Sequence, residues 1–469
     1  MTEKNDKFPA YFSCKEDEHR HLEAFHVCGN LKQSEEWKQG LADNPDKDVD
    51  SLEESAKNKK ITQSDDEDSF SLLIDRLMLS LMSFYHLLAI NSSVRSVFPN
   101  IYIDREFDRF RSELPIIDDS DRIKVYGVPD DKIASMNSKI RRLEHIRDGI
   151  SSIPSSVLMG LVARFDANVS SLVRYLLATR KERLAAGDKS ISVKEVLAAS
   201  SFEDLISDLI EDEIHSLMRG SHEDQVRYIE DNFSIKIRDG FERWPQFIEI
   251  FERRNLAAHG EGVANGRYDR ICARANVPAK DRLAFGDRVV FPDAYLRKAT
   301  DVLLEFGVLL IWWLWLKQDS TDAYQAYSKI NSATYEMIYE KRYRLASRIL
   351  KSCLGRNTTD APETIRRMMA INLANCCKKL NDESGFQKAI SSYDWSASAD
   401  EYKICVASLK LEIDTVCGLM HKVTGDDTVG KAGFRDWPVF DWVRDDEKFA
   451  NRFKEVFGEP LQRPNVDSN

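Results

Sequence analysis

The feature that most constrains the fold is one strongly apolar run, DVLLEFGVLLIWWLWLKQ, at residues 301–318. Glu305 interrupts this run, and the uninterrupted part is shorter than the roughly 20 residues that a membrane-spanning helix needs. We therefore predict a buried helix over residues 293–318 and no membrane contact. The N-terminal text MTEKNDKFPAYFSC lacks the apolar stretch of a signal peptide, so we expect a cytoplasmic protein.

Most of the remaining sequence has the apolar spacing of amphipathic helices. A helix is predicted from Phe70, and a long one over IPSSVLMGLVARFDANVSSLVRYLLATRKERL, with Pro154 near its start. Further helices are predicted up to Gly220 and over residues 221–233, and a loop of about thirty residues is predicted between Gly260 and the helix from Asp293. Residues 97–135 are less regular and predict short elements and a loop. Alternating strand text is scarce, so the sequence predicts an all-α fold.

The length of 469 residues suggests about three folded units. The 42% of hydrophobic residues is enough to build a real core. Composition and helix rhythm give the following division. Residues 1–67 are a charged N-terminal leader, 68–135 a helical and loop-rich extension, 136–319 a helical domain, and 320–469 a C-terminal helical repeat-like domain.

The leader contains zinc-ligand residue types, at Cys14, His19, His21, His26 and Cys28. Their spacing fits no standard closed zinc site, so a polar helix with chance histidines is the favoured interpretation. The eight cysteines of the chain form no CxxC pair, and we interpret them as reduced residues, several of them in the core. We expect neither a metal nor a cofactor.

The C-terminal part changes to short helices separated by polar turns. Tyr343 with Ala346, and Phe386 with Ala389, show the aromatic-x-x-alanine spacing of helix-pair repeats. This region resembles a small tetratricopeptide-like array, and a plain helical bundle remains the alternative. Such helices are expected to hold a regulatory protein, a substrate or a second copy of the chain.

The candidate site is the text FERRNLAAHG, near the end of a predicted helix with Pro245 in its first turn. Asn255 and His259 are four residues apart and share a helix face, and Arg254 is long enough to reach the same end. A helix C-terminus raises the pKa of a histidine, so His259 is expected to titrate near neutral pH. A guanidinium can grip a phosphate with two hydrogen bonds. The group therefore fits RNA cleavage, in which a base activates the 2′-OH, a cation steadies the phosphate and an acid protonates the leaving oxygen.

The surrounding charge agrees with an RNA partner. The chain is acidic, with a formal net charge of −11 and a pI of about 5.5, so general nucleic-acid coating is excluded. Residues 253–282 are nevertheless locally basic, and candidate RNA-binding residues there are Arg253, Arg267, Tyr268 and Arg270. One chain supplies one such histidine. A symmetric homodimer is therefore expected, because it would bring two of them to one cleft.

The segment Arg254-Asn255-Leu256-Ala257-Ala258-His259 resembles the R-x4-6-H signature of the HEPN superfamily. The preceding text WPQFIEIFERRN and the following text GVANGRY are also similar to one branch of that superfamily. The match covers residues 244–268, with a weaker helical match over 137–318, and Ala257-Ala258 departs from it because bulkier residues often stand there.

The resemblance implies a HEPN-like helical bundle that dimerises through the motif helices, followed by the helix-pair region. Many members look like metal-independent endoribonucleases that leave a 2′,3′-cyclic phosphate in toxin or antiphage systems. Arg254 would then steady the phosphate, His259 would transfer protons and Asn255 would be a polar helper.

Two other readings stay open. One is a catalytically silent helical adaptor that dimerises through the same helix, and the other is a nucleotide-sensing scaffold. In the first, the motif is only a capping and ion-pairing arrangement with Glu252 or Glu261. The sequence has no Walker A loop, no Rossmann glycine fingerprint and no GxSxG motif. His86, His145, His215, His222 and His421 have no comparable sequence neighbours, so core or surface roles are expected for them.

Overall fold

The computed structural model describes residues 69–112, 129–186, 196, 199–259, 262–355, 362–425 and 428–461, and the backbone of strands at 11–16, 22–28, 116–120 and 123–126. Within these ranges the side chains of residues 96–111, 143, 185, 186 and 259 are not described. The chain divides into two compact units, Met1–Ser69 and Phe70–Asn469. The predicted boundary at residue 67 lies close to this division, and those at 135 and 319 fall inside the second unit.

The first unit contains an antiparallel hairpin of β1 (Tyr11–Glu16) and β2 (Leu22–Cys28). The expected polar helix is therefore wrong for these residues, whose aromatic and β-branched members favour strands. In this hairpin Cys14 is opposite Phe25, His26 is opposite Ser13 and Cys28 is opposite Tyr11. None of the three candidate zinc ligands in the described strands is therefore paired with another. His19 and His21 lie outside the described residues, so the structure does not test whether the five residues bind zinc.

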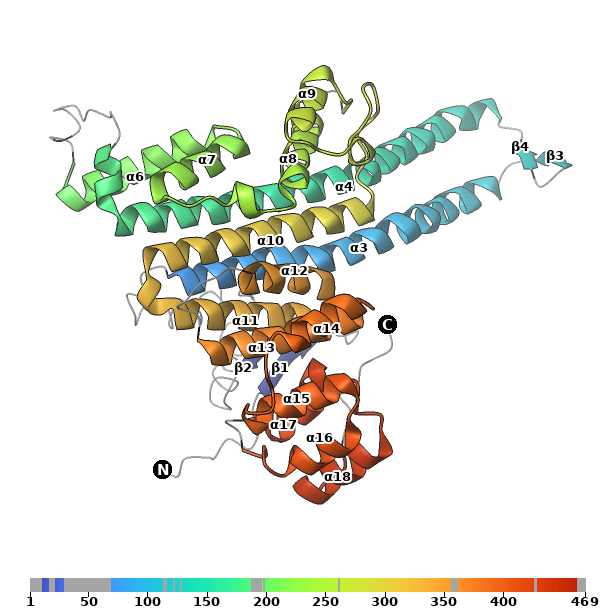
Figure 1. The fold of residues 1–469 in the computed structure, drawn as a ribbon. Helices are drawn as coiled ribbons and strands as arrows, with labels where there is room; N and C mark the ends of the chain where they lie inside the picture. The colour runs from blue at the N-terminus through green and yellow to red at the C-terminus, as the bar shows by residue number, and fades with distance from the viewer. Residues whose placement is uncertain are drawn as a thin grey trace, which may run out of the picture. The chain divides into compact units, whose positions relative to one another are not determined.

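The second unit is built on three long helices, α3 (Phe70–Arg111), α4 (Asp130–Thr179) and α10 (Asp293–Gln318). They pack on one another in all three pairings, and Figure 1 shows α3 and α4 running side by side. A small antiparallel hairpin joins the far ends of α3 and α4, formed by β3 (Ile116–Ser120) and β4 (Ile123–Tyr126). Apart from these hairpins and an isolated bridge between Val263 and Arg288, the regular secondary structure of the described chain is helical, which confirms the all-α class.

Helix α4 corrects the predicted position of Pro154. The helix begins at Asp130, so Pro154 lies inside it and not near its start. Proline removes a helix hydrogen bond. Nearby serine hydroxyls satisfy other carbonyls of the same turns: Ser151 donates to Asp148 O at 2.8 Å and Ser152 to Gly149 O at 2.7 Å. Residues 97–135, expected to be short elements and a loop, continue α3 to Arg111 and then form the hairpin.

Helix α10 is the predicted buried helix, with the bounds expected from sequence. Three helices in the described chain are long and apolar enough to cross a membrane, by length and composition alone: Phe70–Arg95, Asp130–Thr179 and Asp293–Gln318. In α10, 89% of the most apolar stretch is buried inside the protein. Gly307 lets α3 approach closely, because a Cβ at this position would lie 2.7 Å from Leu77 Cδ2.

Shorter helices cover the outer face of α4 and include those that carry the candidate site. They are α6 (Phe202–Met218), α7 (His222–Phe233), α8 (Trp244–His259) and α9 (Gly266–Arg274), with short 3₁₀ turns at Lys181–Ala186, Arg238–Gly240 and Ala279–Asp281. Helix α9 was expected to be loop. Asn265 caps it by accepting hydrogen bonds from the backbone N–H groups of Arg267 and Tyr268.

The remaining helices follow α10 and pack on its other side through α11 and α12. They are α11 (Ala323–Tyr339), α12 (Tyr343–Leu354), α13 (Glu363–Lys379), α14 (Glu383–Ser391), α15 (Asp400–Lys410), α16 (Ile413–Met420), α17 (Gly430–Asp436) and α18 (Glu447–Phe457), with 3₁₀ turns at Ser320–Asp322 and Pro438–Phe440.

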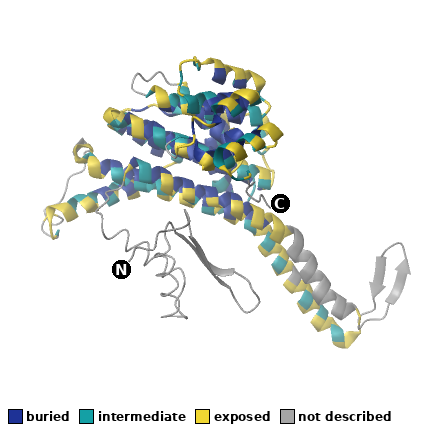
Figure 2. Cartoon of the chain, turned by 90° about the horizontal axis from the view of Figure 1, so that it is seen from below, coloured by how far each residue is buried: buried dark blue, intermediate teal, exposed yellow. Residues whose placement is uncertain are grey.

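A large hydrophobic core runs through the second unit, from Phe70 to Phe453, and a smaller buried cluster lies beside α8 and α9: Leu256, Ala264, Tyr268, Cys272 and Val277. Buried residues concentrate where the helices are stacked, and the first part of α4 is largely exposed (Figure 2). The cysteines whose side chains the structure describes are reduced, and most are buried, as expected of core residues: Cys272, Cys353, Cys376, Cys377, Cys405 and the half-buried Cys417.

Candidate functional site

The predicted site lies on a cavity of about 500 Å³ where α4, α7, α8 and α9 meet. Helix α8 buries Phe247, Ile250 and Phe251 in the core, and Arg254 follows Phe251 by one turn on the same face, which reaches the cavity. Arg254 and Asn255 both line the cavity. Cationic side chains from the neighbouring elements line it too: Arg219, Arg267 and Arg274.

Arg254 is held loosely. Its Nη2 lies 3.8 Å from Asp166 Oδ2 of α4, and its side chain is 22% exposed. Its Nε is buried and has no hydrogen-bond partner among the described residues. A guanidinium with one long ion pair retains donors for a further anion, and a phosphate oxygen is a suitable acceptor.

The same carboxylate holds a histidine that sequence reasoning missed. His222, the first residue of α7, places Nε2 at 2.9 Å from Asp166 Oδ1. Its ring stacks on Phe251 with centroids 3.4 Å apart and planes at 13°. Burial lowers the pKa of His222 and Arg254 acts in the same direction, while the bond to Asp166 raises it. His222 was expected to have an ordinary role, and the structure instead places it on the cavity beside Arg254.

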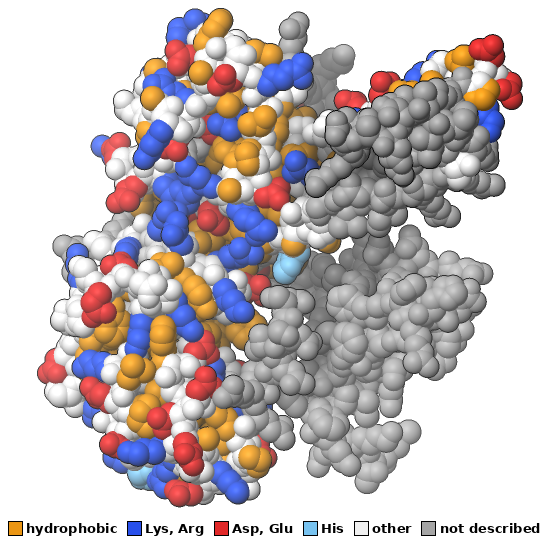
Figure 3. Space-filling view, turned by 90° about the vertical axis from the view of Figure 1, so that its right-hand side faces the viewer, with side chains coloured by type: hydrophobic (Ala, Val, Ile, Leu, Met, Phe, Trp, Pro, Cys, Tyr) orange, Lys and Arg blue, Asp and Glu red, His pale blue; other side chains and the backbone are white. Residues whose placement is uncertain are grey.

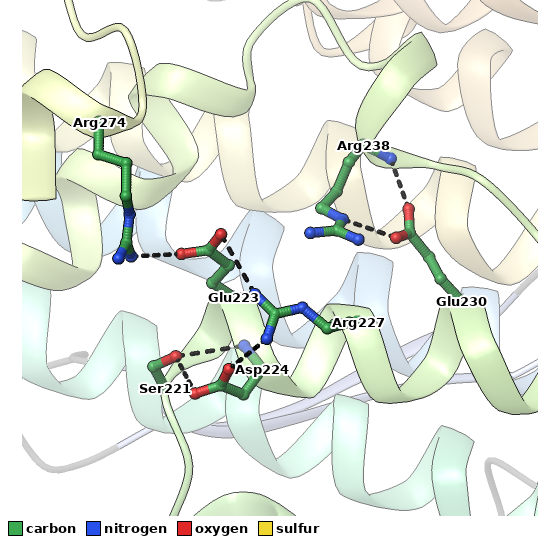
Figure 4. A network of polar contacts seen from close by, with 7 residues as sticks. All are labelled: Ser221, Glu223, Asp224, Arg227, Glu230, Arg238 and Arg274. Atoms are coloured by element: carbon green, nitrogen blue, oxygen red, sulfur yellow. Dashed lines mark hydrogen bonds and ion pairs between the residues drawn. The ribbon is translucent and has the colours of Figure 1, made fainter.

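Two helix N-termini border the cavity. Ser221 caps α7 by accepting the Asp224 N–H, and Asn265 caps α9. Glu223 in the first turn of α7 pairs with Arg274 of α9 at 2.7 Å and with Arg227 at 3.5 Å (Figure 4). The N-terminus of a helix carries partial positive charge. The N-termini of α7 and α9 therefore attract an anion to the cavity, as the arginines do.

Asn255 has a partner one turn earlier in α8. Its Nδ2 donates to Glu252 Oε1 at 3.3 Å. Burial raises the pKa of Glu252, although Arg267 and the hydrogen bond from Asn255 oppose the shift. Glu252 thus lies in the cavity wall as a partly desolvated carboxyl group near Arg267, and Asn255 links it to the motif.

Arg253 and Tyr268 were predicted to bind RNA, and the structure places both in an internal network. Arg253 Nε donates to Glu249 Oε1 at 2.6 Å, Tyr268 Oη donates to the same oxygen at 2.8 Å, and Tyr295 Oη donates to Glu249 Oε2 at 2.9 Å. The Arg253 guanidinium also lies 4.1 Å from the centre of the Tyr295 ring. Arg253 is only 6% exposed and Tyr268 only 1%. Both residues join α8, α9 and α10, and Tyr268 also lies in the cavity lining.

The three remaining predicted site residues are Arg267, Arg270 and His259. Arg267 is exposed and lines the cavity, whereas Arg270 is exposed on α9 outside the cavity lining. His259 is the last residue of α8, and its side chain lies outside the described residues. Figure 3 shows Lys and Arg side chains gathered near the middle of one face, although the formal net charge of the chain is −11.

Within the described part of the chain, no group of three or more His, Cys, Asp or Glu residues has the arrangement of a metal site. Comparison of the chain with protein-family models, curated proteins and solved structures finds no match.

Proposed function

We propose that the protein is a metal-independent endoribonuclease with a HEPN-like catalytic region, acting as a cytoplasmic homodimer in a toxin or antiphage-defence role. The observation that carries the proposal is that Arg254 and Asn255 of the motif line one cavity together with Arg219, Arg267 and Arg274. A cavity of about 500 Å³ with this lining suits a sugar–phosphate unit. The C-terminal helices, in a tetratricopeptide-like arrangement, would hold a regulatory protein.

The chemistry follows from the residue types. Arg254 would bind the non-bridging oxygens of the scissile phosphate and stabilise the extra negative charge of the transition state. Attack by the 2′-oxygen on phosphorus then breaks the bond to the 5′-oxygen and leaves a 2′,3′-cyclic phosphate. By the HEPN resemblance, His259 transfers a proton in this step. Arg267 and Arg270 would contact flanking phosphates, at or beside the cavity.

The test is incubation of the purified protein with total RNA, with and without EDTA, followed by mapping of the cut ends. We expect cleavage that EDTA does not inhibit and that His259→Ala and Arg254→Ala both abolish. The same two substitutions should relieve any growth inhibition caused by expression of the wild-type chain. Intact RNA in every sample would contradict the proposal.

A second candidate is a catalytically silent adaptor or nucleotide-sensing scaffold. It is favoured by the observation that two cavity arginines already have carboxylate partners, in the Arg254–Asp166 and Arg274–Glu223 pairs. Such pairs also occur in purely structural clusters. A nucleotide sensor would gain thermal stability with nucleotides and leave RNA intact.

A further inference from the structure

We propose that His222, positioned by Asp166, is a second proton-transfer group of this cavity, so that one chain supplies two histidines to the reaction. The inference rests on the endoribonuclease function proposed above. His222 reaches the cavity from the first turn of α7, while Arg254 and Asn255 reach it from α8. His259 ends α8 one turn after Asn255.

The hydrogen bond to Asp166 sets the tautomer of the ring. An ionised carboxylate only accepts hydrogen bonds, so Nε2 carries the hydrogen that bonds to Asp166 Oδ1 at 2.9 Å. In the neutral ring Nδ1 then holds a free lone pair. No described residue forms a hydrogen bond with Nδ1. The ring is therefore arranged as a base that a carboxylate orients, which is the usual geometry of a histidine that moves protons.

Packing fixes the ring in this orientation. Phe251 covers one face of the imidazole, and the side chain of His222 is 10% exposed. The charged groups that face it are Asp166 from α4 and Arg254 from α8, and on α7 itself Glu223 is engaged by Arg274. Burial and Arg254 both lower the pKa of His222, so the ring is neutral at pH 7 and can accept a proton.

The proposed step balances as follows. Nδ1 of His222 takes the proton from the 2′-OH as the 2′-oxygen bonds to phosphorus. The bond from phosphorus to the 5′-oxygen breaks, and that oxygen takes a proton from protonated His259. The products are a 2′,3′-cyclic phosphate and a 5′-hydroxyl. His222 then returns its proton to water and His259 regains one.

The decisive substitution is His222→Gln, because the glutamine amide can still donate to Asp166 but cannot act as a base. The substrate is an RNA oligonucleotide that spans the mapped cut site, and binding is measured with the same oligonucleotide carrying a 2′-deoxy sugar at the cut. We expect cleavage to slow by about 100-fold or more, with binding within about 2-fold of wild type. His215→Gln, at an exposed histidine of α6, is the matched control and should cleave normally.

Wild-type cleavage rates in His222→Gln would overturn this inference and leave the endoribonuclease proposal standing, whereas an inactive wild-type chain would overturn both. If His222→Gln does not fold, Asp166→Asn gives the answer through the pH profile. The Asp166 carboxylate raises the pKa of His222, so its neutralisation should move the acid limb of the rate profile to lower pH. An acid limb that does not move would contradict the role of His222.

Mixing experiments test whether both histidines act within one chain. His222→Gln and His259→Ala chains are co-refolded to form mixed dimers. If each cavity uses both histidines of its own chain, every cavity in the mixture lacks one of them, and activity stays low. Recovery of a substantial fraction of wild-type activity would show that the two histidines come from different chains and would overturn the single-chain arrangement.

Discussion

Adjacent arginines in α8 provide the sharpest test of how the site is built. Arg253 belongs to the buried Glu249 network, and Arg254 faces the cavity. We predict that Arg253→Ala destabilises the fold while leaving the chemistry of folded molecules intact. Arg254→Ala should leave the stability of the fold nearly unchanged and should abolish most of the RNA cleavage.

The magnitudes follow from burial. Removal of one partner from a buried ion pair costs about 3–5 kcal/mol, because the other charge is left without compensation. Glu249 would keep hydrogen bonds from Tyr268 and Tyr295, so the lower end of this range applies. Loss of the contact with the Tyr295 ring adds about 1 kcal/mol. We therefore expect Arg253→Ala to cost about 3–4 kcal/mol in free energy of unfolding. The Arg254–Asp166 pair is long and partly exposed, so Arg254→Ala should cost less than about 1 kcal/mol.

The assay is urea unfolding followed by tryptophan fluorescence, in parallel with RNA cleavage at low urea. With a slope of about 3 kcal/mol per M, Arg253→Ala should lower the unfolding midpoint by about 1 M. Arg254→Ala should keep the wild-type midpoint and lose about 100-fold or more in cleavage rate. The reasoning is refuted if the two variants have equal midpoints, or if Arg253→Ala is the one that loses cleavage when folded.

Three further predictions concern the cavity and the core. Arg267→Ala should weaken RNA binding and reduce the slope of log affinity against log salt by about 0.7, measured by fluorescence anisotropy, and Arg270→Ala should have a smaller effect because it lies outside the cavity. Gly307→Ala should cost about 1–3 kcal/mol in urea unfolding, since the added methyl meets α3. Gly149→Ala, with open space around it in α4, should instead be neutral or stabilise by up to about 1 kcal/mol. Burial raises the pKa of Glu252 in the folded protein, so its protonated form stabilises the fold. This contribution is complete below the pKa of the unfolded chain and is lost as pH rises through the pKa of the folded protein. Urea unfolding of Glu252→Gln should therefore show a gain in stability relative to wild type as pH rises from about 4 to 8.

The sequence predicted the fold correctly where the apolar pattern lies within a single helix. The bounds of α10 follow from the local apolar pattern. The buried role of Arg253 was missed, because the prediction of RNA binding considered only its charge, although Glu249, Arg253 and Leu256 recur at helical spacing and form a buried stripe. Neighbouring residues in a helix point about 100° apart, and this rotation separates the internal arginine from the cavity arginine.

The rest of the site depends on contacts between distant elements. Asp166 and His222 are 56 residues apart in sequence, and the packing of α6 and α8 against α4 brings the start of α7 to Asp166. The available signal was weak: a histidine directly after the helix cap Ser221. Helix α9 was missed because it is short, and its cap Asn265 stands in glycine-rich text that also suits a loop.

Helix α10 links the C-terminal helices to the cavity, because it packs against both α8 and α11. On one side Phe306 of α10 contacts Phe247 of α8, with ring centroids 4.2 Å apart. On another, Trp312 packs edge-on against Tyr327 of α11 at 5.2 Å. A chain cut after residue 319 would leave indole rings in water and would be expected to self-associate. A protein bound to the C-terminal helices would therefore act on the same hydrophobic core that packs against the motif helix.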